Sequence, residues 1–150
     1  MQNLSIVPSA FFEAIQGLAS RDSLVKFPRA TPLSTIVKTM AERNIGCVVI
    51  TDYDRPTGIF TERDLMRKIV GQKLDLDQEL VEKHMTSHPV CIGAETAVID
   101  AMNKMTQGKF RHLVLTDDEG LVSGVISVRD LLNFLAKTIT EAMGSNRPAA

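Results

Sequence analysis

Apolar residues recur along this chain with two different periods. In two segments they stand three or four residues apart, which is the spacing of one face of an α-helix. The apolar faces of these two predicted helices are Leu33, Ile36, Val37 and Met40 in the first, and Val98, Ala101, Met102 and Met105 in the second. Before the first helix, Thr31-Pro32 predicts an N-cap followed by proline at the first helical position, where its missing N–H costs nothing.

Other apolar positions are continuous. Residues 47–50 and 113–115 form unbroken apolar runs, which predicts strands that are covered on both faces. Turn-forming residues follow each run and lead to a further strand, at 58–60 and at 124–126. Each unit also has a short first strand and a closing helix, which we predict at 24–27, 90–92, 62–70 and 128–137. Both units therefore have the order β-α-β-β-α.

The two units are copies of one pattern. A shift of 65 residues places Met40 on Met105, and after one extra residue in the second turn Gly58 falls on Gly124. Neither half is large enough to bury its own sheet comfortably. The sequence thus predicts an α/β fold in which two β-α-β-β-α repeats pack face to face about a pseudo-twofold axis, with an added N-terminal helix.

The predicted organisation has five parts. An N-terminal extension, 1–21, contains a helix over 8–20, and the last residues form a tail. The parts in chain order are the extension 1–21, the first repeat 22–73, an acidic linker helix 74–86, the second repeat 87–138 and the tail 139–150.

Composition excludes several classes of protein. With 44% hydrophobic and 23% charged residues, the chain can build a core. A net charge of −1 gives no basic field for nucleic acid or for an anionic membrane, and no apolar run approaches the roughly 18 residues of a membrane span. Cys47 and Cys91 both lie in strand-like runs, which predicts two buried free thiols in a reducing compartment. We therefore expect a cytoplasmic protein.

A polar motif stands where the last strand of each repeat turns into its closing helix. Its members are Thr61, Arg63 and Asp64 in the first repeat and Ser127, Arg129 and Asp130 in the second. A helix start presents free N–H groups that attract anions, the arginine is a planar cation suited to phosphate, and the aspartate can accept hydrogen bonds from the diol of a ribose. The motif therefore favours a nucleoside phosphate. The alternative is a capping box, which only satisfies the helix N–H groups, and both interpretations can hold together.

The complete motifs run from Gly58 to Asp64 and from Gly124 to Asp130, and Met85-Thr86-Ser87-His88-Pro89-Val90 leads into the second copy. In these residues the chain resembles the cystathionine-β-synthase (CBS) domain family in its tandem form, the CBS pair, over about residues 22–137. The resemblance implies a stand-alone pair that binds an adenine nucleotide and is not an enzyme.

The resemblance also implies that each motif works with the other repeat to hold the adenine. The implied partners are Lys26, Phe27, Ile45 and Gly46 for Asp130, and Pro89, Val90 and Phe110 for Asp64. Just before its second strand the second copy has Arg111-His112, where the first copy has the uncharged Gly46-Cys47. Arg111 is thus the best candidate for a phosphate ligand, with a solvated arginine as the alternative, and His112 is a candidate ligand contact. We expect the cleft of Asp130 to be the better equipped of the two.

The expected function is that of a regulatory sensor. It would bind AMP, ADP or ATP as a regulatory ligand, need no cofactor, and signal to an effector protein through a change in helix packing. The family resemblance further implies a homodimer, a disc of two pairs. Two alternatives stay open: a homodimerising scaffold with empty clefts, and a binder of S-adenosylmethionine or NADH. His84, His88 and Cys91 do not share one face, so no metal site is expected.

Overall fold

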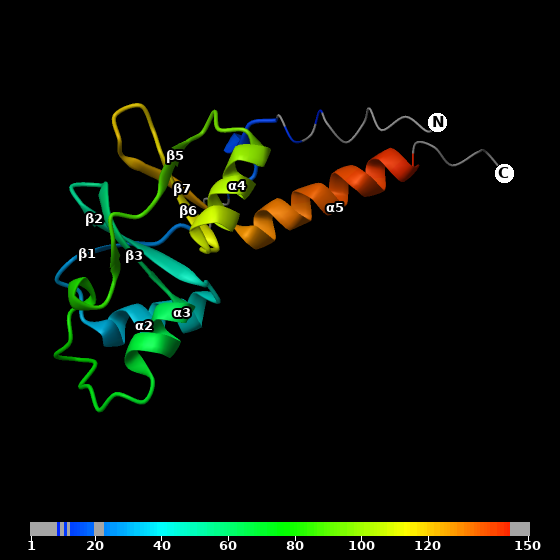
Figure 1. The fold of residues 1–150 in the computed structure, drawn as a ribbon. Coiled ribbons are helices and arrows are strands. Elements are labelled where there is room, and N and C mark those ends of the chain that lie inside the picture. Colours follow the sequence, from blue (N-terminus) through cyan, green and yellow to red (C-terminus); the bar gives the residue numbers. More distant parts are fainter. Residues whose placement is uncertain (1–8, 10, 12, 20–22, 145–150) are drawn as a thin grey trace.

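Two small sheets, each with a helix on its outer face, form the body of the protein (Figure 1). The computed structural model describes residues 9, 11, 13–19 and 23–144. In the first sheet the strand order is β1-β2-β3-β4. Strand β1 (Lys26–Pro28) is parallel to β2 (Cys47–Asp52), and β3 (Arg55–Thr61) is antiparallel to both β2 and β4 (Thr86–Ser87).

The second sheet repeats this arrangement with three strands. Strand β5 (Cys91–Gly93) is parallel to β6 (His112–Thr116), which is antiparallel to β7 (Val122–Ser127). The ladder is irregular at equivalent places, between Ile50 and Thr51 in the first sheet and between Leu115 and Thr116 in the second. The predicted repeat therefore extends to the details of strand pairing.

The predicted helices are present, with different ends. Helix α2 (Leu33–Arg43) and helix α4 (Val98–Gly108) connect the parallel strands. The closing helix of the first repeat starts as α3 (Glu62–Asp64) and continues as a π-helix, Leu65–Ile69. The closing helix of the second repeat, α5 (Val128–Gly144), continues well beyond its predicted end at 137. Residues 139–144 are thus helical and not part of a tail, and 145–150 lie outside the described residues.

Both sheets are covered on both faces, as the continuous apolar runs predict. Between the sheets lie Cys47, Val49 and Ile59 from the first and Val114, Val122 and Val125 from the second. On the outer faces, Val48 and Ile50 pack with α2, and Leu113 and Leu115 pack with α4. This layering confirms the predicted fold, in which two β-α-β-β-α repeats pack face to face.

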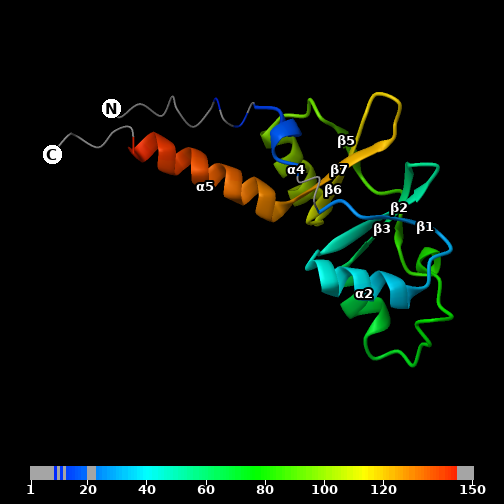
Figure 2. The ribbon, with the colours of Figure 1, turned by 180° about the vertical axis from the view of Figure 1, so that it is seen from behind.

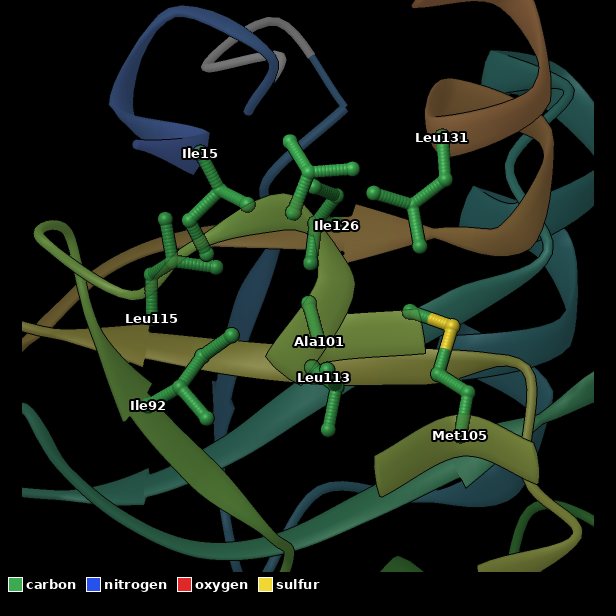
Figure 3. Close-up of a cluster of buried hydrophobic side chains, with 9 residues drawn as sticks. Ile15, Ile92, Ala101, Met105, Leu113, Leu115, Ile126 and Leu131 are labelled. Atoms are coloured by element: carbon green, nitrogen blue, oxygen red, sulfur yellow. The ribbon is translucent and has the colours of Figure 1, made fainter. Parts of the chain in front are cut away.

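The segment before each repeat packs into the core of the other repeat: the N-terminal segment into the second, and the linker into the first. Ile15, from the N-terminal segment, is fully buried in the core of the second repeat (Figure 3). Ala14 pairs with Ala97 just before α4. In the same way Val81, from the linker, is fully buried in the core of the first repeat. Its neighbour Leu80 pairs with residue 32, just before α2.

One helix prediction was wrong and another was wrong in part, since the described residues 9 and 11 are helical. The linker 74–86 contains one 3-10 turn, Val81–Lys83, and no α-helix. Its backbone instead closes the first turn of α2, since Leu33 N–H donates to the Glu79 carbonyl at 2.8 Å. The N-terminal helix over 8–20 is not found in its second half, where Ala14 is extended and Ile15–Gly17 forms a 3-10 turn. Residues 1–8, 10, 12 and 20–22 lie outside the described part of the chain.

Two single-residue predictions were also wrong. The N-cap of α2 is Pro32 and not Thr31, whose hydroxyl donates to the Pro28 carbonyl at 2.7 Å and so closes the turn after β1. Cys91 is exposed, because alternate side chains of the edge strand β5 point outward while Ile92 points into the core. Cys47 is a buried free thiol, as expected. Within the described residues, every helix is too short or too polar to span a lipid bilayer.

Candidate functional site

Both polar motifs form capping boxes. In the first, Thr61 N–H and Oγ1 each donate to Asp64 Oδ2 at 2.9 Å, and Asp64 N–H donates to Thr61 Oγ1 at 3.2 Å. In the second, Ser127 N–H and Oγ donate to Asp130 Oδ2 at 2.7 and 2.8 Å, and Asp130 N–H donates back to Ser127 Oγ at 3.2 Å. The capping interpretation is therefore confirmed for both motifs, and the two boxes have the same geometry.

The second carboxylate oxygen distinguishes the two aspartates. Asp64 Oδ1 forms an ion pair with Lys68 Nζ at 2.7 Å, and the same ammonium donates to the His84 carbonyl of the linker at 2.8 Å. Asp130 has Phe134 one turn further on, where Asp64 has Lys68. The first motif is thus tied through Lys68 to the linker, and the second motif has no equivalent tie within the described residues.

Each closing helix is also tied to the residue just before the second strand of its own repeat. Glu62 N–H donates to the Gly46 carbonyl at 3.0 Å, and Val128 N–H donates to the Arg111 carbonyl at 2.9 Å. Arg63 then links the repeats, because its Nη1 donates to the Lys109 carbonyl at 3.2 Å. These contacts bring both motifs and both strand starts to one edge of the two sheets.

A cleft with a volume of about 1010 Å³ opens at this edge. It is at the upper end of the roughly 300–1,000 Å³ range of small-molecule sites. The predicted site residues that line it are Gly46, Thr61, Arg63, Asp64, Pro89, Val90, Phe110, Arg111, His112, Ser127 and Arg129. Residues of both repeats therefore share one cavity, in which the motif of Asp64 faces the partners expected for it.

Several charged and titratable groups lie close together beneath the cleft. Burial lowers the pKa of His112, and Arg111 lowers it further, while the carboxylates of Asp130 and Glu62 oppose this shift. Burial raises the pKa of the Cys47 thiol to about 12, and the same two carboxylates add to the rise. His112 thus favours its neutral form, and Cys47 stays a thiol and not a reactive thiolate.

Three residues expected beside Asp130 lie elsewhere. Lys26 is exposed and forms an ion pair with Asp54 Oδ1 at 2.7 Å. Phe27 and Ile45 pack against the core of the first repeat. Among the partners expected for Asp130, only Gly46 lines the shared cleft.

Asp130 itself lines a smaller cavity of about 430 Å³, which also includes Leu18 of the N-terminal segment and Phe134 of α5. Arg111 lies in the cleft of Asp64 and not in that of Asp130. The structure therefore makes the Asp64 cleft the better equipped one, in contrast to the expectation from the sequence. The reason is that the residues before β6 lie beside the closing helix of the first repeat, where Arg63 donates to the Lys109 carbonyl.

Among the described residues, four charged or titratable ones that were not predicted from the sequence also line the cleft, two of them at helical spacing from predicted ones. Arg67 and Lys68 line the cleft one turn after Arg63 and Asp64. Glu62 and His88 also line it. Glu62 Oε2 and His112 Nε2 approach Gly46 so closely that a Cβ there would stand 3.7 and 3.5 Å from them. No three His, Cys, Asp or Glu side chains in the described part of the chain gather as metal ligands would.

Known proteins resemble the chain over the same residues. The family model described as CBS domain matches it twice, over residues 15–71 and 79–137. A CBS domain-containing protein of Arabidopsis thaliana is 33% identical over 132 residues, or 81% of this chain and 24% of that protein. A 17.7 kDa protein of Acidianus ambivalens is 32% identical over 131 residues, or 87% of this chain and 77% of that protein. The chain spans about a quarter or less of the Arabidopsis relatives that it matches.

Solved structures agree with this assignment. A CBS domain protein of Pyrobaculum aerophilum, complexed with AMP, superposes with a TM-score of 0.74 at 28% identity, over 85% of this chain and 98% of that chain. A protein with CBS domains from Burkholderia ambifaria gives a TM-score of 0.72 at 27% identity, over 91% and 98%. Since the family matches fall on both halves and these structures share the fold, the chain belongs to the CBS domain family, as a tandem pair of CBS domains.

Proposed function

We propose that this CBS pair is a regulatory module that binds an adenine nucleotide (AMP, ADP or ATP) in the cleft of Asp64. The observation that carries the proposal is the single cavity lined by the motifs of both repeats, Thr61-Arg63-Asp64 and Ser127-Arg129. The AMP bound to the relative from Pyrobaculum aerophilum supports the same class of ligand.

The lining of the cleft suits each part of a nucleotide. Pro89, Val90 and Phe110 offer apolar surface on which an adenine ring can pack. Asp64 is a carboxylate that can accept from the ribose diol, and Arg111 is a guanidinium for phosphate oxygens. Alternative adenosyl ligands, S-adenosylmethionine and NADH, would use the same adenine and ribose contacts.

Lys68 provides a physical route from the ligand to the rest of the protein. A ribose that engages Asp64 Oδ1 competes with the ammonium of Lys68, which also holds the His84 carbonyl of the linker. Release of Lys68 would loosen the linker, whose Val81 completes the core of the first repeat. Ligand occupancy would thus change the packing of helix α2 and signal to an effector protein.

Binding, and not catalysis, is the activity that we propose. In the described part of the cleft, the hydroxyls of Thr61 and Ser127 both donate to their own cap carboxylates. Neither hydroxyl is paired with a histidine that would activate it as a nucleophile.

We also infer that two copies associate through α5. This helix projects from the body in both views (Figures 1 and 2). It carries exposed apolar side chains on one stripe, Leu132, Ile139 and Met143, whose exposures are 58%, 50% and 69%. A second copy that packs against this stripe would bury these three side chains.

Isothermal titration calorimetry with AMP, ADP, ATP, S-adenosylmethionine and NADH tests the ligand proposal. We expect binding of an adenine nucleotide, weakened at least about tenfold by Asp64→Asn, since a charge-assisted hydrogen bond is lost. Asp130→Asn makes the same change in the other repeat, at a carboxylate that caps Ser127 without itself lining this cleft, and should weaken binding less. No heat with any ligand at millimolar concentration would leave the scaffold as the better explanation, and a larger loss in Asp130→Asn would overturn the choice of cleft.

A further inference from the structure

The cleft of Asp64 carries an excess of positive charge. Its cationic side chains are Arg63, Arg67, Lys68, Arg111 and Arg129, and its carboxylates are Glu62 and Asp64. Counted without the histidines, these groups leave an excess of three positive charges, although the whole chain has a net charge of −1 on the same count. The cleft therefore has a charge opposite to that of the chain as a whole.

The excess lies mainly on three arginines. Lys68 is neutralised by Asp64, and Arg63 donates to the Lys109 carbonyl. Within the described residues, Arg67, Arg111 and Arg129 have neither an ion pair nor a side-chain hydrogen bond to the protein. All three are exposed and line the same cavity.

These three guanidinium groups come from different elements. Arg67 belongs to the π-helix of the first repeat, Arg129 to the first turn of α5, and Arg111 to the residues before β6. A guanidinium binds phosphate oxygens through two parallel N–H groups. Like charges that converge on one cavity repel each other, and only an anion with several charged groups can offset all of them.

We infer that the cleft selects its ligand by the number of phosphates and takes a nucleoside triphosphate in strong preference to the monophosphate. A monophosphate carries about two negative charges near neutral pH, and every further phosphate in a chain adds another. The guanidinium groups belong to both repeats, Arg67 to the first and Arg111 and Arg129 to the second, so a chain of several phosphates offers more groups for them to contact than a single phosphate does. This inference rests on the proposed function and narrows its ligand class.

The test is calorimetric titration of the full chain with AMP, ADP, ATP and inorganic tripolyphosphate, without divalent cations. Affinity should rise with each phosphate, by about tenfold or more from AMP to ATP, if charge-assisted contacts are gained. Tripolyphosphate should compete with ATP. Arg129→Ala and Arg67→Ala should each reduce the affinity for ATP about tenfold and reduce that for AMP by less, because one guanidinium contact to the longer phosphate chain is lost.

Arg55→Ala is the matched control. Arg55 is exposed at the other end of β3, at the hairpin and away from the cleft, so its loss should leave both affinities unchanged. Thermal unfolding of each variant checks that the fold is intact. Equal affinity for AMP and ATP would overturn the triphosphate preference and leave the proposed function standing. Binding of tripolyphosphate without binding of any adenine nucleotide would overturn the proposed function, and with it the nucleoside triphosphate preference.

Discussion

At the scale of the residue, the two motif glycines serve packing within the protein. A Cβ at Gly58 would overlap the side chain of Met85, which is buried against the first repeat. A Cβ at Gly124 would stand 3.3 Å from the Cβ of Ala19, which is tight but not overlapping. The neighbours of both glycines are side chains, Met85 from the linker and Ala19 from the N-terminal segment.

This difference predicts unequal costs for the same substitution. Gly58→Ala should lower the free energy of unfolding by about 1–3 kcal/mol, since Met85 must move in a packed core. Gly124→Ala should cost less, because Ala19 needs to shift by only a few tenths of an ångström. Urea denaturation of both variants measures the difference. Equal losses, or a larger loss for Gly124→Ala, would contradict this account of the two positions.

The lowered pKa of His112 predicts how the stability of the fold depends on pH. Burial lowers its pKa in the folded protein, so below the unfolded value of about 6.5 the unfolded state binds more protons. The contribution of His112 is fully present above that pH and is lost as the pH falls toward the folded pKa. Asp130 and Glu62 oppose the shift and Arg111 adds to it. Urea denaturation at pH 7.5 and 5.5 should show a smaller drop for His112→Gln than for the natural chain, and an identical drop would exclude this role.

At the scale of the element, the two closing helices show how similar sequences diverge. Both start with a complete capping box. The first then changes to a π-helix and ends at Ile69, while α5 runs for 17 residues. Helix α5 has no proline or glycine before Gly144, so the turn residues that end the first helix have no counterpart there. The added length places an apolar stripe outside the body of the protein.

The stripe on α5 predicts self-association that a single charged residue weakens. Ile139→Glu should shift the protein toward the monomer, because a carboxylate in an apolar interface loses its hydration. Lys137→Gln, on the opposite face of α5, should leave the association unchanged. Sedimentation velocity at several concentrations measures both. A natural chain that sediments as a monomer throughout, or two variants that behave alike, would rule out α5 as the interface.

At the scale of the whole molecule, the repeats exchange their leading segments. Ile15 precedes the first repeat in sequence and is buried in the second, and Val81 precedes the second and is buried in the first. The family matches begin at residues 15 and 79, so each includes such a segment. The exchange explains why neither half is expected to fold alone.

The exchange predicts long-range effects of core truncation. Ile15→Ala should lower the free energy of unfolding by about 2–5 kcal/mol. In the Ile15→Ala variant, backbone amides should lose the most protection from hydrogen exchange in α4 and β6. The amides of β1 and α2, which follow Ile15 in the chain, should lose less. Native-state hydrogen exchange maps the loss residue by residue. Val81→Ala should give the opposite pattern, with the greatest loss of protection in the first repeat. For either variant, a loss mainly in the repeat that follows the substituted residue in the chain would contradict the exchange.

The sequence by itself determined the repeat, the order of elements and the strands buried on both faces. Those features follow from local periodicity and from apolar runs such as 47–50, which act over a few residues. Eleven of the candidate site residues, named from the motifs and from the family resemblance, line the cleft, although Gly46, Arg111, Ser127 and Arg129 were expected at the cleft of Asp130.

Only the tertiary structure decided which residues meet across the repeats. The assignment of Arg111 to the cleft of Asp64, the burial of Ile15 in the far repeat and the unwound linker depend on contacts between segments far apart in sequence. The linker looked helical because its composition permits a helix. It forms turns instead of an α-helix, and its Glu79 carbonyl accepts from the free N–H of Leu33 at the start of α2. This hydrogen bond joins segments far apart in the sequence, so no local pattern records it.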